Sequence, residues 1–148
     1  MNYSKKTVPT PLREGFSLLE LLIVIVILGG LVGVVAPGLM DTAEQAKRDT
    51  VCLKMNEQKK VFDTFKLENG VYPDTEEGFN ALISNPDSEK YPNYRNTPYA
   101  KKIPKDAWKT PFVYIKKGDD IEIISLGADR REGGEGNGKD ILLSECNK

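Results

Sequence analysis

The sequence predicts an α+β protein in which a long N-terminal helix packs on a small head that contains a short antiparallel sheet. Residues 16–36 form an apolar run that only Ser17 and Glu20 interrupt, and residues 41–69 are charged but favour helix. Within the second stretch one apolar face recurs at helical spacing, made of Val51, Met55, Phe62 and Phe65. Further along the chain, β-branched and aromatic segments alternate with turn residues, which predicts strands.

Composition argues against two classes of function. Lysine and arginine number 21 against 22 acids, so the chain lacks the basic excess typical of nucleic-acid-binding proteins. The absence of histidine removes the commonest general base and the commonest zinc ligand. Asp106 and Trp108 can be offered as an active site, but a turn aspartate beside a packed tryptophan explains them better. We therefore expect no enzymatic activity.

The apolar run 16–36 would span about 30 Å as a helix, enough to cross a bilayer core. A secretory signal peptide would be shorter and would end in a small-residue cleavage site, which the sequence lacks here. A plain signal anchor fits the length and the basic flank, which would keep the N-terminus cytoplasmic. It leaves Glu20 unexplained, because a carboxylate inside a membrane helix costs about 2.5–3.5 kcal/mol and therefore needs a partner.

The segment around Glu20 resembles the processing site of prepilins and pseudopilins. It reads Gly15-Phe16-Ser17-Leu18-Leu19-Glu20, after a basic leader and at the start of the apolar run. The resemblance implies that a prepilin peptidase cuts between Gly15 and Phe16, removes the leader 1–15 and methylates the amine of Phe16. It also implies that Glu20 pairs with the Phe16 amine of a neighbouring subunit during assembly.

The long helix is predicted to run from about Phe16 to Asn69, with Gly70 as its stop. The head, residues 71–148, is expected to begin with a short helix near residues 75–82, capped by Asp74 or Thr75. Residues 84–102 are rich in Pro, Asn and Tyr and predict a loop. Strands are predicted at residues 111–115, 121–126 and 141–143, with a turn at residues 117–120.

Three head segments narrow the resemblance to the major pseudopilins of type II secretion systems. They are YPDTEEGFNAL, PYAKKIPKDAWKTPFVYI and SLGADRREGGEGNGKDI, and they occur in the family's order. Major type IV pilins share the N-terminal signature but, as a rule, not these segments. The sequence departs from the family pattern at Ala107, Lys109, Arg130 and Gly138, where the family has proline, glycine, glycine and aspartate.

The loop 127–140 is rich in glycine and acids. From the residues alone, a calcium site and a solvated acidic loop are both open, because calcium takes six to eight oxygens from carboxylates and carbonyls. The resemblance implies one calcium ion that orders the head, held by Asp129, Asp140 and the Leu126 carbonyl, with a further oxygen from Asn137. Gly138 lies where the family often has a second aspartate.

Cys52 lies beside the apolar helix face, and Cys146 lies close to the C-terminus. Their separation excludes a CxxC motif. If the head is periplasmic, the oxidising compartment favours a disulfide that fastens the tail to the helix. Two unpaired, buried cysteines are the alternative.

The resemblance implies a structural subunit that polymerises from the bacterial inner membrane into a periplasmic fibre, the pseudopilus of a type II secretion system, whose growth drives protein export across the outer membrane. Residues 16–36 would be the single membrane pass, and residues 37–70 would be the periplasmic part of the helix. The expected partners are further copies of the chain, minor pseudopilins, the inner-membrane assembly platform and the prepilin peptidase. A major type IV pilin of a surface pilus is the alternative.

Overall fold

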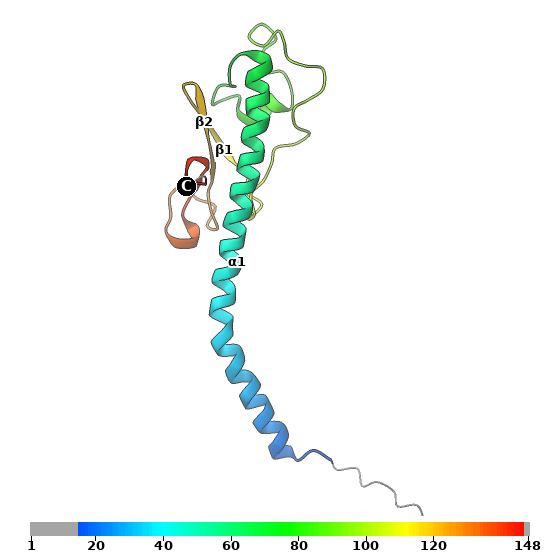
Figure 1. Cartoon of the computed structure of the whole chain (residues 1–148), viewed down its shortest axis with the longest axis vertical. Helices are drawn as coiled ribbons and strands as arrows, with labels where there is room; N and C mark the ends of the chain where they lie inside the picture. Colours follow the sequence, from blue (N-terminus) through cyan, green and yellow to red (C-terminus); the bar gives the residue numbers. More distant parts are fainter. Residues whose placement is uncertain (1–14, 147–148) are drawn as a thin grey trace, which may run out of the picture. The chain divides into compact units, whose positions relative to one another are not determined.

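A computed structural model describes residues 15–146, except for the side chains of residues 32–40. The chain divides into two compact units, Met1–Met40 and Asp41–Lys148. Helix α1 runs from Leu18 to Asn69 and contributes to both units (Figure 1). Apart from Gly15, the predicted leader lies outside the described residues.

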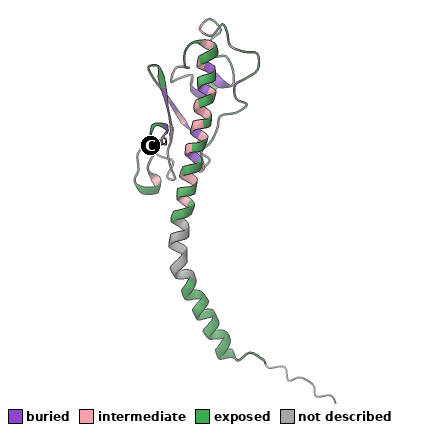
Figure 2. Ribbon diagram, in the orientation of Figure 1, coloured by how far each residue is buried: buried purple, intermediate pink, exposed green. Residues whose placement is uncertain are grey.

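In the second unit, α1 presents one apolar face to the head, and Figure 2 shows this face as buried patches on the helix. The side chains on it are fully buried, with an exposed fraction of 0% for Val51, Met55, Phe62 and Phe65. The helix ends as predicted, because Gly70 adopts a φ of +85°, which is open to glycine at no steric cost. The Gly70 N–H donates to the Lys66 carbonyl at 2.7 Å, which satisfies one carbonyl of the last turn.

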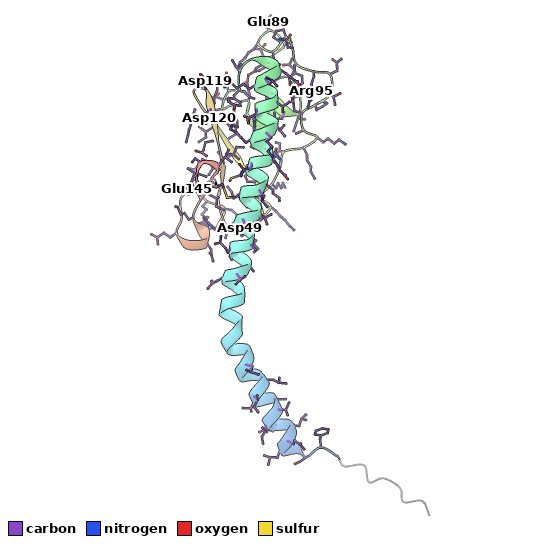
Figure 3. All side chains as sticks on the ribbon, in the orientation of Figure 1. Asp49, Glu89, Arg95, Asp119, Asp120 and Glu145 are labelled. Carbon is purple, nitrogen blue, oxygen red and sulfur yellow. A yellow bond between two sulfur atoms is a disulfide. The ribbon has the colours of Figure 1, made fainter. Side chains whose placement is uncertain are left out.

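The sheet has three strands in the order β1-β2-β3, and both pairings are antiparallel. Its strands are β1 (Val113–Lys117), β2 (Asp120–Ser125) and β3 (Ile141–Leu142). Lys117 pairs with Asp120, so Gly118 and Asp119 form a tight hairpin turn, and Asp119 and Asp120 lie at this end of the hairpin (Figure 3). All three predicted strands are present, although the first begins two residues later than predicted.

Aromatic rings join α1 to the sheet and to the long loop. The Phe62 ring lies 4.5 Å from that of Tyr114 in β1 and 5.1 Å from that of Phe79, measured between centroids. The Phe65 ring lies 5.1 Å from the rings of both Tyr91 and Tyr99. The loop at residues 84–102 has no helix or strand, as predicted. The contacts of Tyr91 and Tyr99 with Phe65 hold it against the core.

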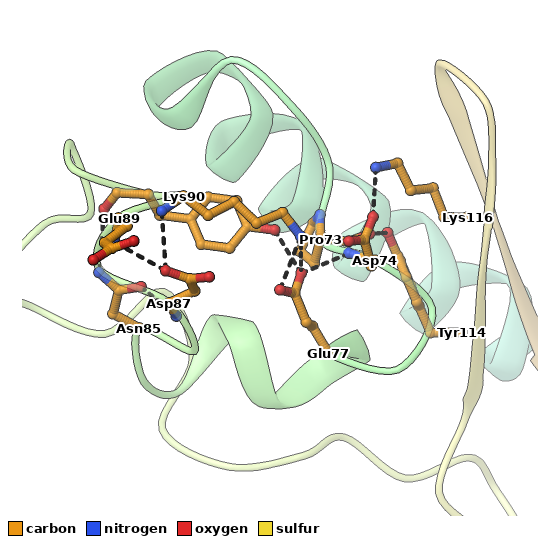
Figure 4. Close-up of polar contacts among 10 residues, drawn as sticks. Pro73, Asp74, Glu77, Asn85, Asp87, Glu89, Lys90, Tyr114 and Lys116 are labelled. Carbon is orange, nitrogen blue, oxygen red and sulfur yellow. Dashed lines mark hydrogen bonds and ion pairs between the residues drawn. The ribbon is translucent and has the colours of Figure 1, made fainter.

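The short helix after the turn at residue 74 differs from the prediction. It is a 3-10 helix, η1 (Gly78–Leu82), and no side chain caps it. The Asp74 carboxylate instead accepts hydrogen bonds from the ammonium groups of Lys90 and Lys116 (Figure 4). The Thr75 hydroxyl accepts the backbone N–H of Lys116 at 3.1 Å. The prediction that Asp74 or Thr75 caps this helix was wrong, because both side chains form hydrogen bonds with lysines that are distant in the sequence.

The same polar cluster fastens the segment before η1 to the loop and to β1. Lys116 lies 2.8 Å from Asp74, and Lys90 lies 2.9 Å from Glu77, measured from ammonium nitrogen to carboxylate oxygen. The hydrogen bonds from Lys116 and then Lys90 lower the pKa of Asp74 to about 2. Since the Asp74 side chain is about half exposed, solvent screening limits its contribution to stability to under about 1 kcal/mol.

Cys52 in α1 forms a disulfide with Cys146, with 5.4 Å between the two Cα atoms. Cys146 directly follows the 3-10 helix η3 (Leu143–Glu145), which itself follows β3. The bond therefore fastens the last part of the head to α1.

Asp106 has a structural role in a turn before β1. Its side chain is buried, and its carboxylate accepts hydrogen bonds from the Trp108 N–H at 2.9 Å, the Thr110 N–H at 2.8 Å and the Ser125 hydroxyl at 2.7 Å. The Trp108 indole N–H donates to Glu44 on α1 at 3.3 Å. Asp106 and Trp108 therefore pack and form hydrogen bonds within the head.

Candidate functional site

The predicted processing and assembly residues lie at the start of α1. Ser17 caps the N-terminal end of α1, since its side-chain oxygen accepts the Leu19 N–H at 3.3 Å and its carbonyl accepts the Leu21 N–H at 3.1 Å. Glu20 therefore lies in the first helical turn. Phe16 directly precedes this cap and is 84% exposed. A cut after Gly15 would place a new amine at the same helix end as the Glu20 carboxylate.

The apolar side chains of this unit are exposed along its described length. Figure 2 shows residues 15–31 as exposed, and they include every large apolar residue from Leu18 to Leu31. Within the described part of the chain, no helix is long and apolar enough to cross a membrane. Because the side chains of residues 32–36 lie outside that part, the membrane span at residues 16–36 stays a prediction.

The loop between β2 and β3 folds back on itself through backbone hydrogen bonds. The Ala128 N–H donates to the Asn137 carbonyl at 3.2 Å, and the Asp140 N–H donates to the Gly133 carbonyl at 3.0 Å. One 3-10 turn, η2 (Gly136–Gly138), lies between these contacts. Gly127, Gly133, Gly134 and Gly136 all have positive φ, which explains the glycine content of the loop.

Both predicted carboxylate ligands contact the same stretch of loop backbone. Asp140 Oδ2 accepts the Gly133 N–H at 3.0 Å. Asp129 Oδ2 and the Gly138 carbonyl oxygen lie 2.8 Å and 2.5 Å from the point that a Cβ on Gly134 would occupy. These oxygens therefore approach the Gly133–Gly134 backbone so closely that a side chain at residue 134 would collide with them.

One oxygen of this loop is left without a partner. Asp140 Oδ1 is buried and makes no hydrogen bond. A buried, unpaired carboxylate oxygen is costly, so a cation or another donor is needed beside it. Among the described residues, no group of three or more His, Cys, Asp or Glu side chains is placed to hold a metal ion. Calcium coordination here would depend on two carboxylates together with carbonyl oxygens.

A further contact of this loop could not be predicted from the sequence. The Arg48 guanidinium on α1 donates to the Lys139 carbonyl at 3.3 Å, immediately before Asp140. This bond fastens the loop to the helix. The sequence carries no signal for it, because an arginine on an exposed helical turn has no distinctive spacing relative to a loop 91 residues away.

Comparisons with known proteins place this architecture in one family. The family model of type II secretion system (T2SS), protein G, matches residues 38–144. The chain is 41% identical to the type II secretion system core protein G of Vibrio cholerae over 87% of this chain and 90% of that protein. It is 37% identical to the protein of the same name from Pseudomonas aeruginosa, over 87% and 93% of the two chains.

A solved structure gives the same result for the fold. The crystal structure of the major pseudopilin from the type 2 secretion system of enterohaemorrhagic Escherichia coli is similar, with a TM-score of 0.62 and 32% sequence identity. The match covers 72% of this chain and 93% of that one. The long helix, the three-stranded antiparallel sheet and the glycine-rich loop are therefore the parts of a pseudopilin, and this chain belongs to the type II secretion system protein G family.

Proposed function

We propose that this chain is a structural subunit that polymerises into the periplasmic pseudopilus of a type II secretion system, whose growth drives protein export across the outer membrane. The observation that carries this proposal is the family match over the head, since the relatives bear the name of the secretion system's core protein G. A surface pilus is not favoured by these relatives. The role is one of assembly, with no catalytic step.

Residues 16–36 would anchor the subunit in the inner membrane, with the N-terminus in the cytoplasm and the head in the periplasm. The exposed apolar side chains of residues 18–31 support this proposal, because such a surface is stable in lipid or against neighbouring subunits. The disulfide agrees with an oxidising compartment for the head. Partners would be further copies of the chain, minor pseudopilins, the assembly platform and the prepilin peptidase.

Within the membrane, Glu20 would pair with the methylated amine of Phe16 on a neighbouring subunit. Each charge alone is costly in lipid, and their contact would offset much of that cost. The position of Glu20 in the first helical turn supports the proposal, because a new terminus at Phe16 would lie at that end of the helix.

Glu20→Ala is expected to leave cleavage after Gly15 intact and to reduce the assembled fibre at least tenfold. The reason is that the Phe16 amine then has no carboxylate to meet in the membrane. The measurement is the mass of the processed chain together with the yield of sheared fibres from cells. Glu76→Ala, which removes an exposed acid of the head, serves as the matched control and should assemble normally. Normal fibre yield with Glu20→Ala would contradict the pairing.

The loop between β2 and β3 would hold one calcium ion through Asp129, Asp140, the Leu126 carbonyl and an Asn137 oxygen. The buried, unpaired Asp140 Oδ1 and the close approach of Asp129 to the Gly134 backbone support this proposal. A bound calcium ion would supply the positive charge that two neighbouring carboxylates need. Gly138 contributes no side chain, so its carbonyl is the oxygen that this residue offers.

Calcium is expected to raise the melting temperature of the purified full-length chain by several degrees relative to chelator. A ligand that binds only the folded state stabilises it by about 2.7 kcal/mol at one hundred times its dissociation constant. Asp140→Asn should remove most of this shift, whereas Glu76→Ala should keep it. An equal melting temperature in calcium and in chelator would exclude the site and leave the fibre function unaffected.

A further inference from the structure

The chain contains two Asn-Gly pairs, Asn69-Gly70 and Asn137-Gly138. Such a pair can deamidate without an enzyme, because the backbone nitrogen of the glycine can attack the side-chain amide of the asparagine. Glycine favours this step, since it has no Cβ to obstruct the ring and gives the backbone the freedom to close it. The two pairs have the same local sequence, so the fold decides which of them reacts.

The fold restrains the pair at the end of α1. The Asn69 side-chain amide donates to the Phe65 carbonyl at 3.0 Å and to the Tyr99 hydroxyl at 2.9 Å. Its Oδ1 is buried. The Gly70 N–H donates to the Lys66 carbonyl at 2.7 Å, as part of the last helical turn. Closing a ring here would pull the amide away from the core and break the end of the helix.

The pair in the loop between β2 and β3 is held much less. Asn137 is exposed, and within the described chain its side chain forms no hydrogen bond (Figure 2). It belongs to η2, a single 3-10 turn of three residues, none of which is buried. The Gly138 N–H donates to the Glu135 carbonyl at 3.0 Å, so this turn must open before the Gly138 nitrogen can attack.

Opening this turn requires little of the head to change. Besides the bond of the Gly138 N–H, the turn is held by the Lys139 N–H on the Gly136 carbonyl and by the Ala128 N–H on the Asn137 carbonyl, at 3.3 and 3.2 Å. An exposed segment without buried apolar side chains opens locally at a low free energy, far below that of global unfolding. The end of α1, in contrast, follows Phe65, which is fully buried.

We propose that Asn137 is a modification site, which deamidates spontaneously in the folded chain at a rate at least tenfold that of Asn69. The observations that carry this proposal are the exposed, unbonded Asn137 side chain and the core contacts of the Asn69 side chain. The inference goes beyond the fibre function and does not depend on it.

The reaction needs water as its only co-reactant. The Gly138 nitrogen forms a bond to Cγ of Asn137, the bond between Cγ and Nδ2 breaks, and the proton from the Gly138 nitrogen leaves with the amide as ammonia. Water then opens the cyclic imide. Attack at Cγ gives aspartate, whereas attack at the backbone carbonyl carbon gives isoaspartate, in which the main chain continues through the former side chain.

Either product changes the chemistry of this loop. It adds a carboxylate between Asp129 and Asp140 in the sequence. Isoaspartate also lengthens the main chain by one carbon, at the residue whose carbonyl accepts the Ala128 N–H. A long-lived subunit would therefore become more acidic at this loop while the rest of its head stays the same.

The test follows both pairs in one sample of the purified full-length chain. The chain is incubated in detergent and chelator at mildly alkaline pH, digested at intervals and analysed by mass spectrometry. The peptide with Asn137 should gain the mass of an amide-to-acid change at least tenfold faster than the peptide with Asn69, and part of the product should be isoaspartate. Equal rates, or a faster reaction at Asn69, would overturn the proposal.

Unfolding provides the matched control. In urea with a reducing agent, the two pairs should react at rates within about threefold of each other, because the restraint at the end of α1 is gone. A tenfold difference that persists in urea would also overturn the proposal, since the difference would then come from the local sequence and not from the fold.

Two variants assign the mass change to its residue. Asn137→Gln should abolish it in the loop peptide, because a glutamine side chain must close a larger and less favourable ring. Asn69→Gln should leave the rate at Asn137 unchanged. A mass change of the loop peptide that survives Asn137→Gln would contradict the assignment. All these rates are measured on the purified chain, so failure of the fibre function would show separately, as absence of wild-type fibres in cells.

Discussion

Loss of the disulfide is expected to lower the free energy of unfolding of the full chain by roughly 2–5 kcal/mol. The bond between Cys52 and Cys146 closes a loop of 94 residues that contains almost the whole head. A crosslink across so long a loop removes many conformations from the unfolded chain, and the stabilisation grows with loop length. It also keeps Cys146 against the core, where its sulfur lies 4.0 Å from that of Met55.

The measurement is urea unfolding of Cys52→Ser with Cys146→Ser beside wild type, both in the same mild detergent. Cys52→Ser alone should match the double variant, because either change removes the bond. A reducing agent should destabilise wild type by a similar amount and leave the double variant unchanged. A difference below about 0.5 kcal/mol between wild type and the double variant would show that the bond adds little to the folded state.

The elements that depend on neighbouring residues could be predicted from the sequence. The buried face of α1 follows from the spacing of Val51, Met55, Phe62 and Phe65, and all four are fully buried. The helix stop at Gly70 follows from the preference of glycine for positive φ. The hairpin is found near its predicted place, because a tight turn and two β-rich segments are also local signals.

Features that depend on distant residues were not predictable in the same way. Asp74 has the sequence pattern of a helix cap, but Lys90 and Lys116, which lie 16 and 42 residues further along, bind its carboxylate. The contact of Arg48 with the Lys139 carbonyl arises only when the loop folds against α1.

Phe62→Ala is expected to be the most damaging single truncation in the head, with a loss of about 3–5 kcal/mol in the free energy of unfolding. Phe62 is fully buried, and its ring contacts Tyr114 of β1 and Phe79 of η1. Removing it takes a large apolar surface from the core and leaves a cavity where α1, the sheet and η1 meet. The neighbouring rings would also lose their aromatic contacts.

Leu67→Ala provides the matched control on the same helix. Leu67 is 85% exposed, so its truncation should change the free energy of unfolding by no more than about 0.5 kcal/mol. Phe62→Leu should fall between the two, because it keeps much of the apolar volume. Urea unfolding of the three variants measures the series, and equal losses for Phe62→Ala and Leu67→Ala would show that the head does not depend on this face of α1. The predicted order would show that α1 supports the core of the head through this buried face.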